Sequence, residues 1–274
     1  MSGNLQQHKY WNGQAGETWT SNQVKLDRML SPLSAEAVRI AAAMPGERVI
    51  DIGCGCGDTS IALAGTGAVV QGIDLSKPML SLASQRAQAM QGVSFTQADA
   101  AVLPFAQPVQ LLFSRFGVMF FEDPIKAFRH LHGGLSKDGR LVFICWQKPT
   151  ANPWMSLGGR ALQPFLPAPA SPPDPRAPGP FAFSDPAYVE DVLVNAGFNE
   201  IVIEPLKRDL KVADTLDEAL MIQGQVGPAA RAMAELSGDD LEKALDAVRQ
   251  VLQDHMSDQG LWLGSAVWLV SARF

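Results

Sequence analysis

VIDIGCGCGDTSIALA, residues 49–64, joins the ends of two secondary-structure elements through a glycine-rich turn. The apolar opening is typical of a buried strand that ends at Asp51, and the close is typical of a helix that begins directly after the glycines. Gly53, Gly55 and Gly57 allow the backbone of the turn to adopt positive φ and to approach a ligand closely. Because the start of the helix also offers free N–H groups to a carboxylate or phosphate, the stretch predicts a site for a nucleotide-like cofactor.

Short apolar runs alternate with helical patterns around this turn, between about residues 49 and 146. This alternation is typical of a parallel α/β sheet, whose ligand crevice lies at the carboxyl ends of the strands. The runs are ERVIDIG, AVVQGIDL, VSFTQAD, VQLLFSR and GRLVFICW, and a sixth and a final strand follow as NEIVIEPLK and LWLGSAVWLVSARF. We predict an α/β fold with a doubly wound, Rossmann-like, seven-stranded and mostly parallel sheet that carries helical lid insertions.

The rest of the chain predicts one domain over residues 1–274 with insertions. Residues 11–44 indicate two helices, the second of which begins at Ser31 and Pro32. Nine of the 19 prolines fall between Pro164 and Pro186, too many for a helix or a central strand, so this stretch is expected to be an irregular loop. The predicted parts are an N-terminal helical cap (1–46), a cofactor-binding core (47–148), a Pro-rich insertion (149–184) and a C-terminal part of the sheet (185–274) with a helical lid insertion (214–256).

Composition narrows the classes of partner and location. The chain has 22 Lys and Arg against 28 Asp and Glu, a net charge of -6, and no basic run, which argues against a nucleic-acid partner. Its three cysteines, an odd number in a chain of this length, favour reduced thiols in the cytoplasm, and their spacing predicts no metal site. No run reaches the roughly 18 apolar residues of a spanning helix, so neither export nor a membrane anchor is expected.

Three carboxylates stand at strand ends that a parallel sheet brings to one edge. Asp51 precedes the glycines, where it would repel a pyrophosphate but suits a cationic amine or sulfonium; capping of the turn is its structural alternative. Asp74 closes the second strand and can accept both hydroxyls of a ribose. Asp99 follows the third strand and can accept from an adenine amino group, while the N–H of Ala100 faces a ring nitrogen. These residues predict an adenosine that carries a positively charged amino-acid tail.

With this ordered set of motifs the chain resembles the class I S-adenosylmethionine-dependent methyltransferases of the bacterial small-molecule type. The family pattern D-x-G-x-G-x-G matches residues 51–57, GIDLSKPML matches its ribose acid, and QADAAVLPF its adenine-binding pair. SRFGVMFFEDPIKAF, residues 114–128, resembles the fourth-strand exit and the next helix. WNGQAGETW, residues 11–19, resembles an N-terminal segment that folds over the cofactor in one branch. Cys56 stands where threonine or serine is commoner.

The resemblance implies S-adenosyl-L-methionine as the cofactor, S-adenosyl-L-homocysteine as the product, and no metal. Predicted cofactor contacts are Trp11, Trp19, Asp51, Gly53, Cys54, Gly55, Asp74, Leu75, Met79, Asp99, Ala100 and Ser114. Predicted acceptor contacts are Tyr10, Phe116, Trp146, Asn152 and Trp154. Trp11 and Trp19 could equally belong to a helix stripe that packs on the core. Trp146, Asn152 and Trp154 could equally serve only to pack their loop.

The implied reaction is an in-line displacement at the sulfonium methyl group, with transfer to oxygen or nitrogen of a small metabolite. Because the cofactor carries the electrophile, positioning and desolvation do most of the catalytic work. His8 is the predicted base, since it lies beside Tyr10 in the N-terminal arm expected to cross the pocket. The other three histidines favour packing or surface roles. The fourth strand exits as SRFG, which disfavours amide and DNA-base methylation.

Two other functions stay open at this point. The chain could hold the cofactor without turnover, or it could be a nucleotide-dependent oxidoreductase, although the latter would need G-x-G-x-x-G in place of G-x-G-x-G. The expected partner is a small-molecule acceptor, with no nucleic acid and no membrane, and a homodimer is an open option.

Overall fold

The computed structural model describes residues 4–167 and 174–274. The chain divides into two compact units. Unit 1 comprises Met1–Trp146, Arg176–Leu206 and Val267–Phe274, and unit 2 comprises Gln147–Pro175 and Lys207–Ala266. Every strand end discussed below for the cofactor lies in unit 1. The single-domain organisation with its insertion boundaries stays a prediction.

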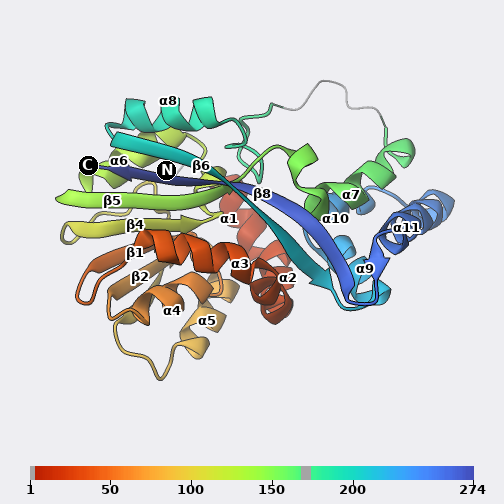
Figure 1. The fold of residues 1–274 in the computed structure, drawn as a ribbon, viewed down its shortest axis with the longest axis horizontal. Helices are drawn as coiled ribbons and strands as arrows, with labels where there is room; N and C mark the ends of the chain where they lie inside the picture. Colours follow the sequence, from red (N-terminus) through yellow and green to blue (C-terminus); the bar gives the residue numbers. More distant parts are fainter. Residues whose placement is uncertain (1–3, 168–173) are drawn as a thin grey trace. The chain divides into compact units, whose positions relative to one another are not determined.

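Strands β1 to β5, with the parts of β6 and β8 that belong to unit 1, form the centre of that unit, and the remainder of the mixed sheet belongs to unit 2 (Figure 1). In the described residues the order of the sheet is β3-β2-β1-β4-β5-β8-β6, and β7 pairs with β8 beside this path. Strands β1 to β5 pair in parallel, and β8 runs antiparallel to β5. The doubly wound, mostly parallel sheet is therefore confirmed, and the two-residue β7 is an addition to it. The strands are β1 (Arg48–Ile52), β2 (Val69–Asp74), β3 (Val93–Gln97), β4 (Val109–Arg115), β5 (Leu135–Trp146), β6 (Asn199–Ala213), β7 (Met256–Ser257) and β8 (Gly260–Arg273).

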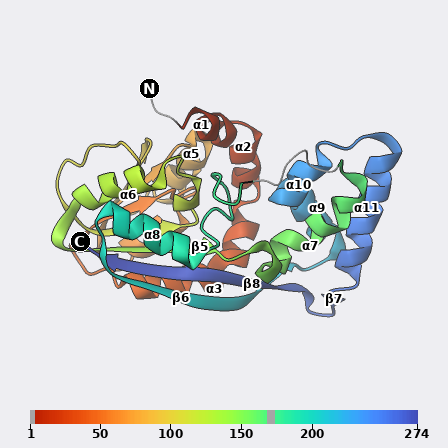
Figure 2. The ribbon, with the colours of Figure 1, turned by 90° about the horizontal axis from the view of Figure 1, so that it is seen from above.

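Helices cover both faces of this sheet. The helix α3 (Gln23–Ala41) contacts β4 and β5, whereas α4 (Asp58–Ala64) and α5 (Lys77–Arg86) contact β2 and β3. Helices α6 (Pro124–Gly133) and α8 (Pro186–Ala196) pack on each other, on the side of the sheet opposite α3 (Figure 2). With both faces covered, the central strands β1 and β4 are nearly continuous apolar runs with buried side chains.

Three of these helices begin by the same local rule. A capping side chain accepts a hydrogen bond from the first turn, and a proline follows directly or one residue later. The capping residues are Ser76 for α5, Asp123 for α6 and Asp185 for α8.

The N-terminal region differs from the two predicted helices. It forms α1 (Leu5–Asn12), α2 (Gln14–Ser21) and α3, and Pro32 lies inside α3 instead of opening a new helix. An interior proline costs a helix about 3 kcal/mol, but a buried apolar stripe continues across it and offsets this cost. The stripe consists of Leu26, Met29, Leu30, Leu33, Ala37 and Ala41.

Unit 2 consists largely of helices. It contains α7 (Pro153–Leu162), α9 (Leu216–Gln225), α10 (Pro228–Met233) and α11 (Gly238–Gln253), with short 3-10 turns at Pro149–Ala151 and Gln163–Phe165. Helices α9, α10 and α11 lie within the range 214–256, for which a helical insertion was expected, and their role as a lid stays a prediction. Part of the proline-rich loop, 168–173, lies outside the described residues. Within 4–167 and 174–274, no helix is both long and apolar enough to cross a membrane.

Candidate functional site

The glycine turn after β1 lies against the turn after β4. Gly53, Gly55 and Gly57 all have positive φ, at 66°, 55° and 82°. A Cβ added at Gly53 would lie 2.7 Å from the Cα of Gly117, so the two backbones are in close contact. Ser114 Oγ donates to the carbonyl of Ile52 at 2.7 Å and accepts from the N–H of Gly117 at 3.2 Å. Ser114, a predicted cofactor contact, is fully buried and joins the ends of β1 and β4.

Asp51 is fully buried at the end of β1. Its Oδ2 accepts from Thr59 Oγ1 at 2.7 Å and from Ser60 Oγ at 2.6 Å, both on α4. The carboxylate thus bonds to hydroxyl groups of the helix, whereas the structural alternative had it capping the N–H groups of the turn. Oδ1 accepts no hydrogen bond from the described residues. Burial, opposed by the Ser60 and Thr59 hydrogen bonds, raises the pKa of Asp51 to about 6. A buried carboxylate oxygen without a donor suits a cationic ligand group.

Asp74 holds the glycine turn from the end of β2. Its Oδ2 accepts from the N–H of Gly55 and its Oδ1 from the N–H of Ser76, each at 2.8 Å. Burial raises the pKa of Asp74 above its ordinary value, with these backbone hydrogen bonds opposing the rise. Because a carboxylate offers about four acceptor positions, both oxygens keep capacity for further donors. Met79, on the first turn of α5, is buried beside Gly55.

The cysteines of the turn are neutral buried thiols. Cys54 and Cys56 are both free and buried. Burial raises the pKa of the Cys56 thiol to about 12 and that of Cys54 well above its ordinary value. In the described part of the chain, no group of three or more His, Cys, Asp or Glu side chains is arranged to hold a metal ion.

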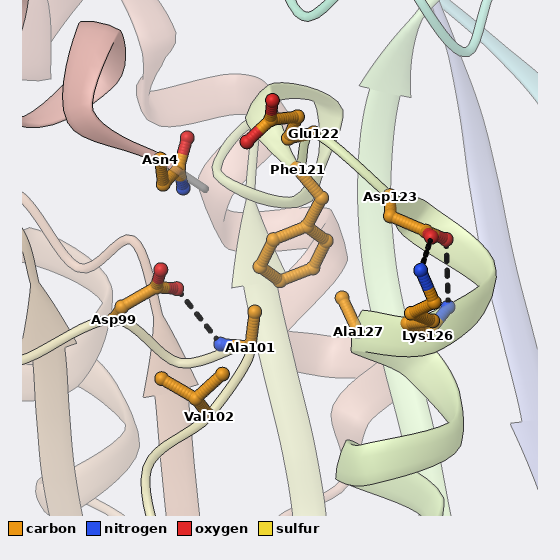
Figure 3. Close-up of a pocket in the computed structure, with 9 residues that line it drawn as sticks. All are labelled: Asn4, Asp99, Ala101, Val102, Phe121, Glu122, Asp123, Lys126 and Ala127. Carbon is orange, nitrogen blue, oxygen red and sulfur yellow. Dashed lines mark hydrogen bonds and ion pairs between the residues drawn. The ribbon is translucent and has the colours of Figure 1, made fainter. Parts of the chain in front are cut away.

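Asp99 lies at the edge of a cavity of about 520 Å³ in unit 1. Its Oδ1 accepts from the N–H of Ala101 at 2.9 Å, and Ala100 is buried. Figure 3 shows the Phe121 ring between the Asp99 side of this cavity and the ion pair of Asp123 and Lys126. The lining residues are Asn4, Asp99, Ala101, Val102, Phe121, Glu122, Asp123, Lys126 and Ala127. Sequence reasoning did not find Phe121, which lies in the segment that resembles the fourth-strand exit.

The corner between α1 and α2 is fastened to the end of β2. The carbonyl of Trp11 accepts from Ser76 Oγ at 2.7 Å. Asn12 Nδ2 donates to the carbonyl of Leu75 at 2.8 Å, and its Oδ1 accepts from the N–H of Lys77 at 3.0 Å. Asn12 was not among the predicted site residues, although an Asn-Gly pair at residues 12–13 is a recognisable turn signal.

The two predicted tryptophans contact each other, and Trp11 also contacts Phe120, which follows β4 in the chain. The Trp11 ring makes edge contacts with Trp19 at a centroid distance of 6.1 Å and with Phe120 at 5.4 Å. Trp11 thus lies beside Ser76, which follows β2, and beside Phe120, in the turn after β4, while Trp19 contacts Trp11. The contact of either tryptophan with the cofactor stays a prediction.

Two of the predicted acceptor residues stack on each other. The rings of Phe116 and Trp146 are 4.0 Å apart and nearly parallel, at 6°. Phe116 adopts a positive φ of 64°, a conformation that costs a residue with a side chain on the order of 1–3 kcal/mol and is concentrated at functional sites. Tyr10 is exposed on α1 and contacts the edge of Trp11 at 5.0 Å.

The remaining predicted acceptor residues, Asn152 and Trp154, belong to unit 2, and the predicted base, His8, belongs to α1. Asn152, in unit 2, is fully buried; its Nδ2 donates to the carbonyls of Gln147 and Ala266, and its Oδ1 accepts from the N–H of Ala266. These bonds agree with the packing alternative stated above, and the contact of Asn152 with an acceptor stays a prediction. Trp154 is buried in α7 of unit 2. His8 is exposed on α1, and its carbonyl accepts from Asn12.

Comparisons with known proteins agree with this geometry. Residues 49–139 match the family described as a methyltransferase domain. The demethylmenaquinone methyltransferase of Thermus thermophilus is 35% identical over 117 residues, which make up 41% of this chain and 53% of that protein. The trans-aconitate 2-methyltransferase of Klebsiella pneumoniae is 31% identical over 145 residues, 49% of this chain and 56% of that protein. The chain thus spans about half the length of these curated relatives.

The fold has a counterpart among solved structures. The YcgJ protein of Bacillus subtilis matches with a TM-score of 0.58 at 18% identity, and the match covers 88% of this chain and 97% of that chain. A likeness at this identity concerns the fold. Residues 49–139 therefore match the methyltransferase-domain family, and the fold of the chain is similar to that of the YcgJ protein.

Proposed function

We propose that this chain transfers a methyl group from S-adenosylmethionine to oxygen or nitrogen of a small molecule. The observation that carries the proposal is the buried Oδ1 of Asp51, which accepts no hydrogen bond from the described residues and lies beside a glycine turn at the strand ends. A cationic amino group would satisfy this oxygen. A pyrophosphate would place like charges together, which disfavours a dinucleotide and hence the oxidoreductase alternative.

The residues present fit the proposed cofactor group by group. Asp51 would hold the amino group, Asp74 would accept from the ribose hydroxyls through its remaining lone pairs, and Asp99 would accept from the adenine amino group. The N–H of Ala100 would face a ring nitrogen of the adenine. When bound, S-adenosylmethionine supplies an electrophilic methyl group on a sulfonium, and the protein needs to add no electrophile of its own.

The acceptor is proposed to lie against the Phe116 and Trp146 rings. These rings form an apolar wall at the ends of β4 and β5, beside the turn that Ser114 ties to β1. An apolar part of the acceptor packed on this wall would be oriented and shielded from water, the two contributions that a displacement at a methyl carbon needs most. A small, partly apolar molecule is thus the proposed partner, and the cytoplasm remains the expected location.

Methyl transfer itself is the direct test. The chain, incubated with methyl-labelled S-adenosylmethionine and a panel of hydroxylated and amine-bearing small molecules, should yield an acceptor heavier by one labelled methyl group in mass spectrometry. Protection from thermal unfolding by S-adenosylhomocysteine without any labelled product would favour a protein that only binds the cofactor. Protection by NAD instead would favour the oxidoreductase.

Replacing Asp74 tests the ribose assignment. Asp74→Ala removes an ionised acceptor proposed to take two hydroxyl hydrogen bonds, so the affinity for S-adenosylhomocysteine should fall by about 100-fold or more. Isothermal titration calorimetry measures this loss. Asp185→Ala is the matched control, because Asp185 also accepts from a backbone N–H but caps α8, and its affinity should equal that of the wild type. Wild-type affinity in Asp74→Ala would contradict the assignment.

The burial of Asp51 predicts a pH dependence of stability in the unliganded protein. Its pKa rises from an ordinary value of 3.8 to about 6, so between these values the folded chain holds a proton that the unfolded chain has released. Stability therefore falls as pH rises through this range. The asparagine of Asp51→Asn does not titrate, so only the wild type should lose stability in this way. The free energy of unfolding of Asp51→Asn, taken relative to the wild type, should therefore rise by at most about 3 kcal/mol between about pH 4 and pH 8.

Urea unfolding at a series of pH values measures this difference, and Asp185→Asn, which changes the exposed cap of α8, serves as the control variant. A pH-independent difference for Asp51→Asn would show that Asp51 ionises as an ordinary carboxylate.

His8 is the proposed base for an acceptor that must lose a proton. If it acts so, His8→Ala should lower kcat by a factor of about 10² to 10⁴ with little change in cofactor affinity. The measurement is the pH profile of kcat for the acceptor found above, with Gln6→Ala on the same exposed helix as the control. An unchanged profile in His8→Ala would remove His8 from the reaction.

A further inference from the structure

Four charged side chains form a cluster behind the glycine turn. Asp27 of α3 pairs with Arg86 of α5 at 2.9 Å, and Arg115 at the end of β4 pairs with Asp58 at the start of α4 at 3.1 Å. Longer contacts of 3.8 Å join Arg86 to Asp58 and Arg115 to Asp27. Each arginine therefore touches both aspartates, and the cluster connects four elements of unit 1.

The cluster holds the turn directly. Arg86 Nη1 donates to the carbonyl of Cys56 at 2.6 Å, inside the glycine turn. Arg115 Nη1 also donates to Ser34 Oγ at 2.7 Å, which joins the cluster to α3. Gln23 donates to Asp27, so that carboxylate is oriented from its own helix as well. Burial raises the pKa of the Cys56 thiol, and the charge of Asp27 raises it further.

The cluster is balanced and largely shielded from water. It contains two cations and two anions, and the exposed fractions of the side chains range from 11% for Arg115 to 28% for Asp58. Removing one charge leaves an unpaired one at a site where solvent screens it poorly. The field of the cluster also reaches Asp51: burial raises the pKa of that carboxyl, and the Arg115 guanidinium opposes the rise.

We propose that this cluster positions the glycine turn and fixes the charge balance behind it, so that Asp27 of the N-terminal cap helps the site to prefer a cationic ligand. This inference rests on the proposed function, because it concerns the difference between S-adenosylmethionine and S-adenosylhomocysteine. The sulfonium gives the first ligand one positive charge more than the second. Asp27 and Arg86 act through the turn and are positioning residues in this account.

The test compares the affinities of the two ligands in charge variants, by titration calorimetry at low ionic strength. Asp27→Asn leaves an excess positive charge, so the preference for S-adenosylmethionine over S-adenosylhomocysteine should fall by about fourfold to sixteenfold, as expected for one unit charge on the order of 10 Å away at an effective dielectric constant near 20 to 40. Arg86→Gln should shift the same ratio in the opposite direction. The double variant restores neutrality and should return the ratio toward the wild-type value.

Glu36→Gln is the matched control, because it removes the same charge from the same helix but at a residue that pairs with the exposed Arg39. Its ratio should not change. A purely structural role of the cluster would lower both affinities equally or lower only the melting temperature, and either result would overturn the inference.

Should Asp27→Asn fail to fold, an unshifted ratio in Arg86→Gln would overturn it as well. A wild type that binds neither ligand would instead contradict the proposed function, so the two failures can be told apart.

Discussion

The close approach of two backbones, at Gly53 after β1 and at Gly117 after β4, is the constraint on which the site depends. A Cβ at Gly117 would lie 2.5 Å from the carbonyl oxygen of Ile52, so a side chain at this position would push the strand ends apart. Ser114 Oγ makes hydrogen bonds to the carbonyl of Ile52, at the end of β1, and to the N–H of Gly117, and these bonds hold the two backbones in contact. Because neighbouring parallel strands end at the same edge, the contact fixes where Asp51 and Phe116 stand relative to each other.

The carboxylates around this contact have different partners and therefore differ in how many further hydrogen bonds they can accept. Asp51 is buried, with one oxygen held by hydroxyls of α4 and the other without a donor from the described residues. Asp74 accepts one hydrogen bond on each oxygen, from the N–H of Gly55 in the glycine turn and from the N–H of Ser76 after β2. Asp27 and Asp58 are neutralised by two arginines. Of these four carboxylates, Asp51 is the one with a buried oxygen that accepts no hydrogen bond from the described residues, and this is the oxygen that the proposed cationic group of the ligand would meet.

The parts of the fold that follow from local signals could be predicted from the sequence. The alternation of apolar runs with helical patterns and the glycine spacing are properties of neighbouring residues. They predicted β1, the glycine turn, α4 and the mostly parallel direction of the strands. The three acids predicted to hold the adenosine and the amino group were placed near strand ends for the same reason, since each closes or follows an apolar run, and their contacts with the cofactor stay predictions.

Features that depend on distant contacts were not found. The continuation of α3 through Pro32 is decided by burial of its apolar stripe against the sheet. The fastening of Asn12 to Leu75 and the cluster of Asp27, Arg86, Asp58 and Arg115 join segments far apart in the sequence, and no local pattern marks such pairs. Asn152 is a related case: its side-chain amide makes hydrogen bonds to backbone groups of Gln147 and Ala266, and those to Ala266, far along the chain, could not be predicted from the sequence.

A crystal structure of the chain with S-adenosylhomocysteine bound tests the central claim most directly. The account predicts the amino nitrogen of the ligand within hydrogen-bond distance of Asp51 Oδ1, the ribose hydroxyls on Asp74 and the adenine amino group on Asp99. A ligand bound elsewhere, or bound here with Asp51 Oδ1 still without a donor, would contradict it.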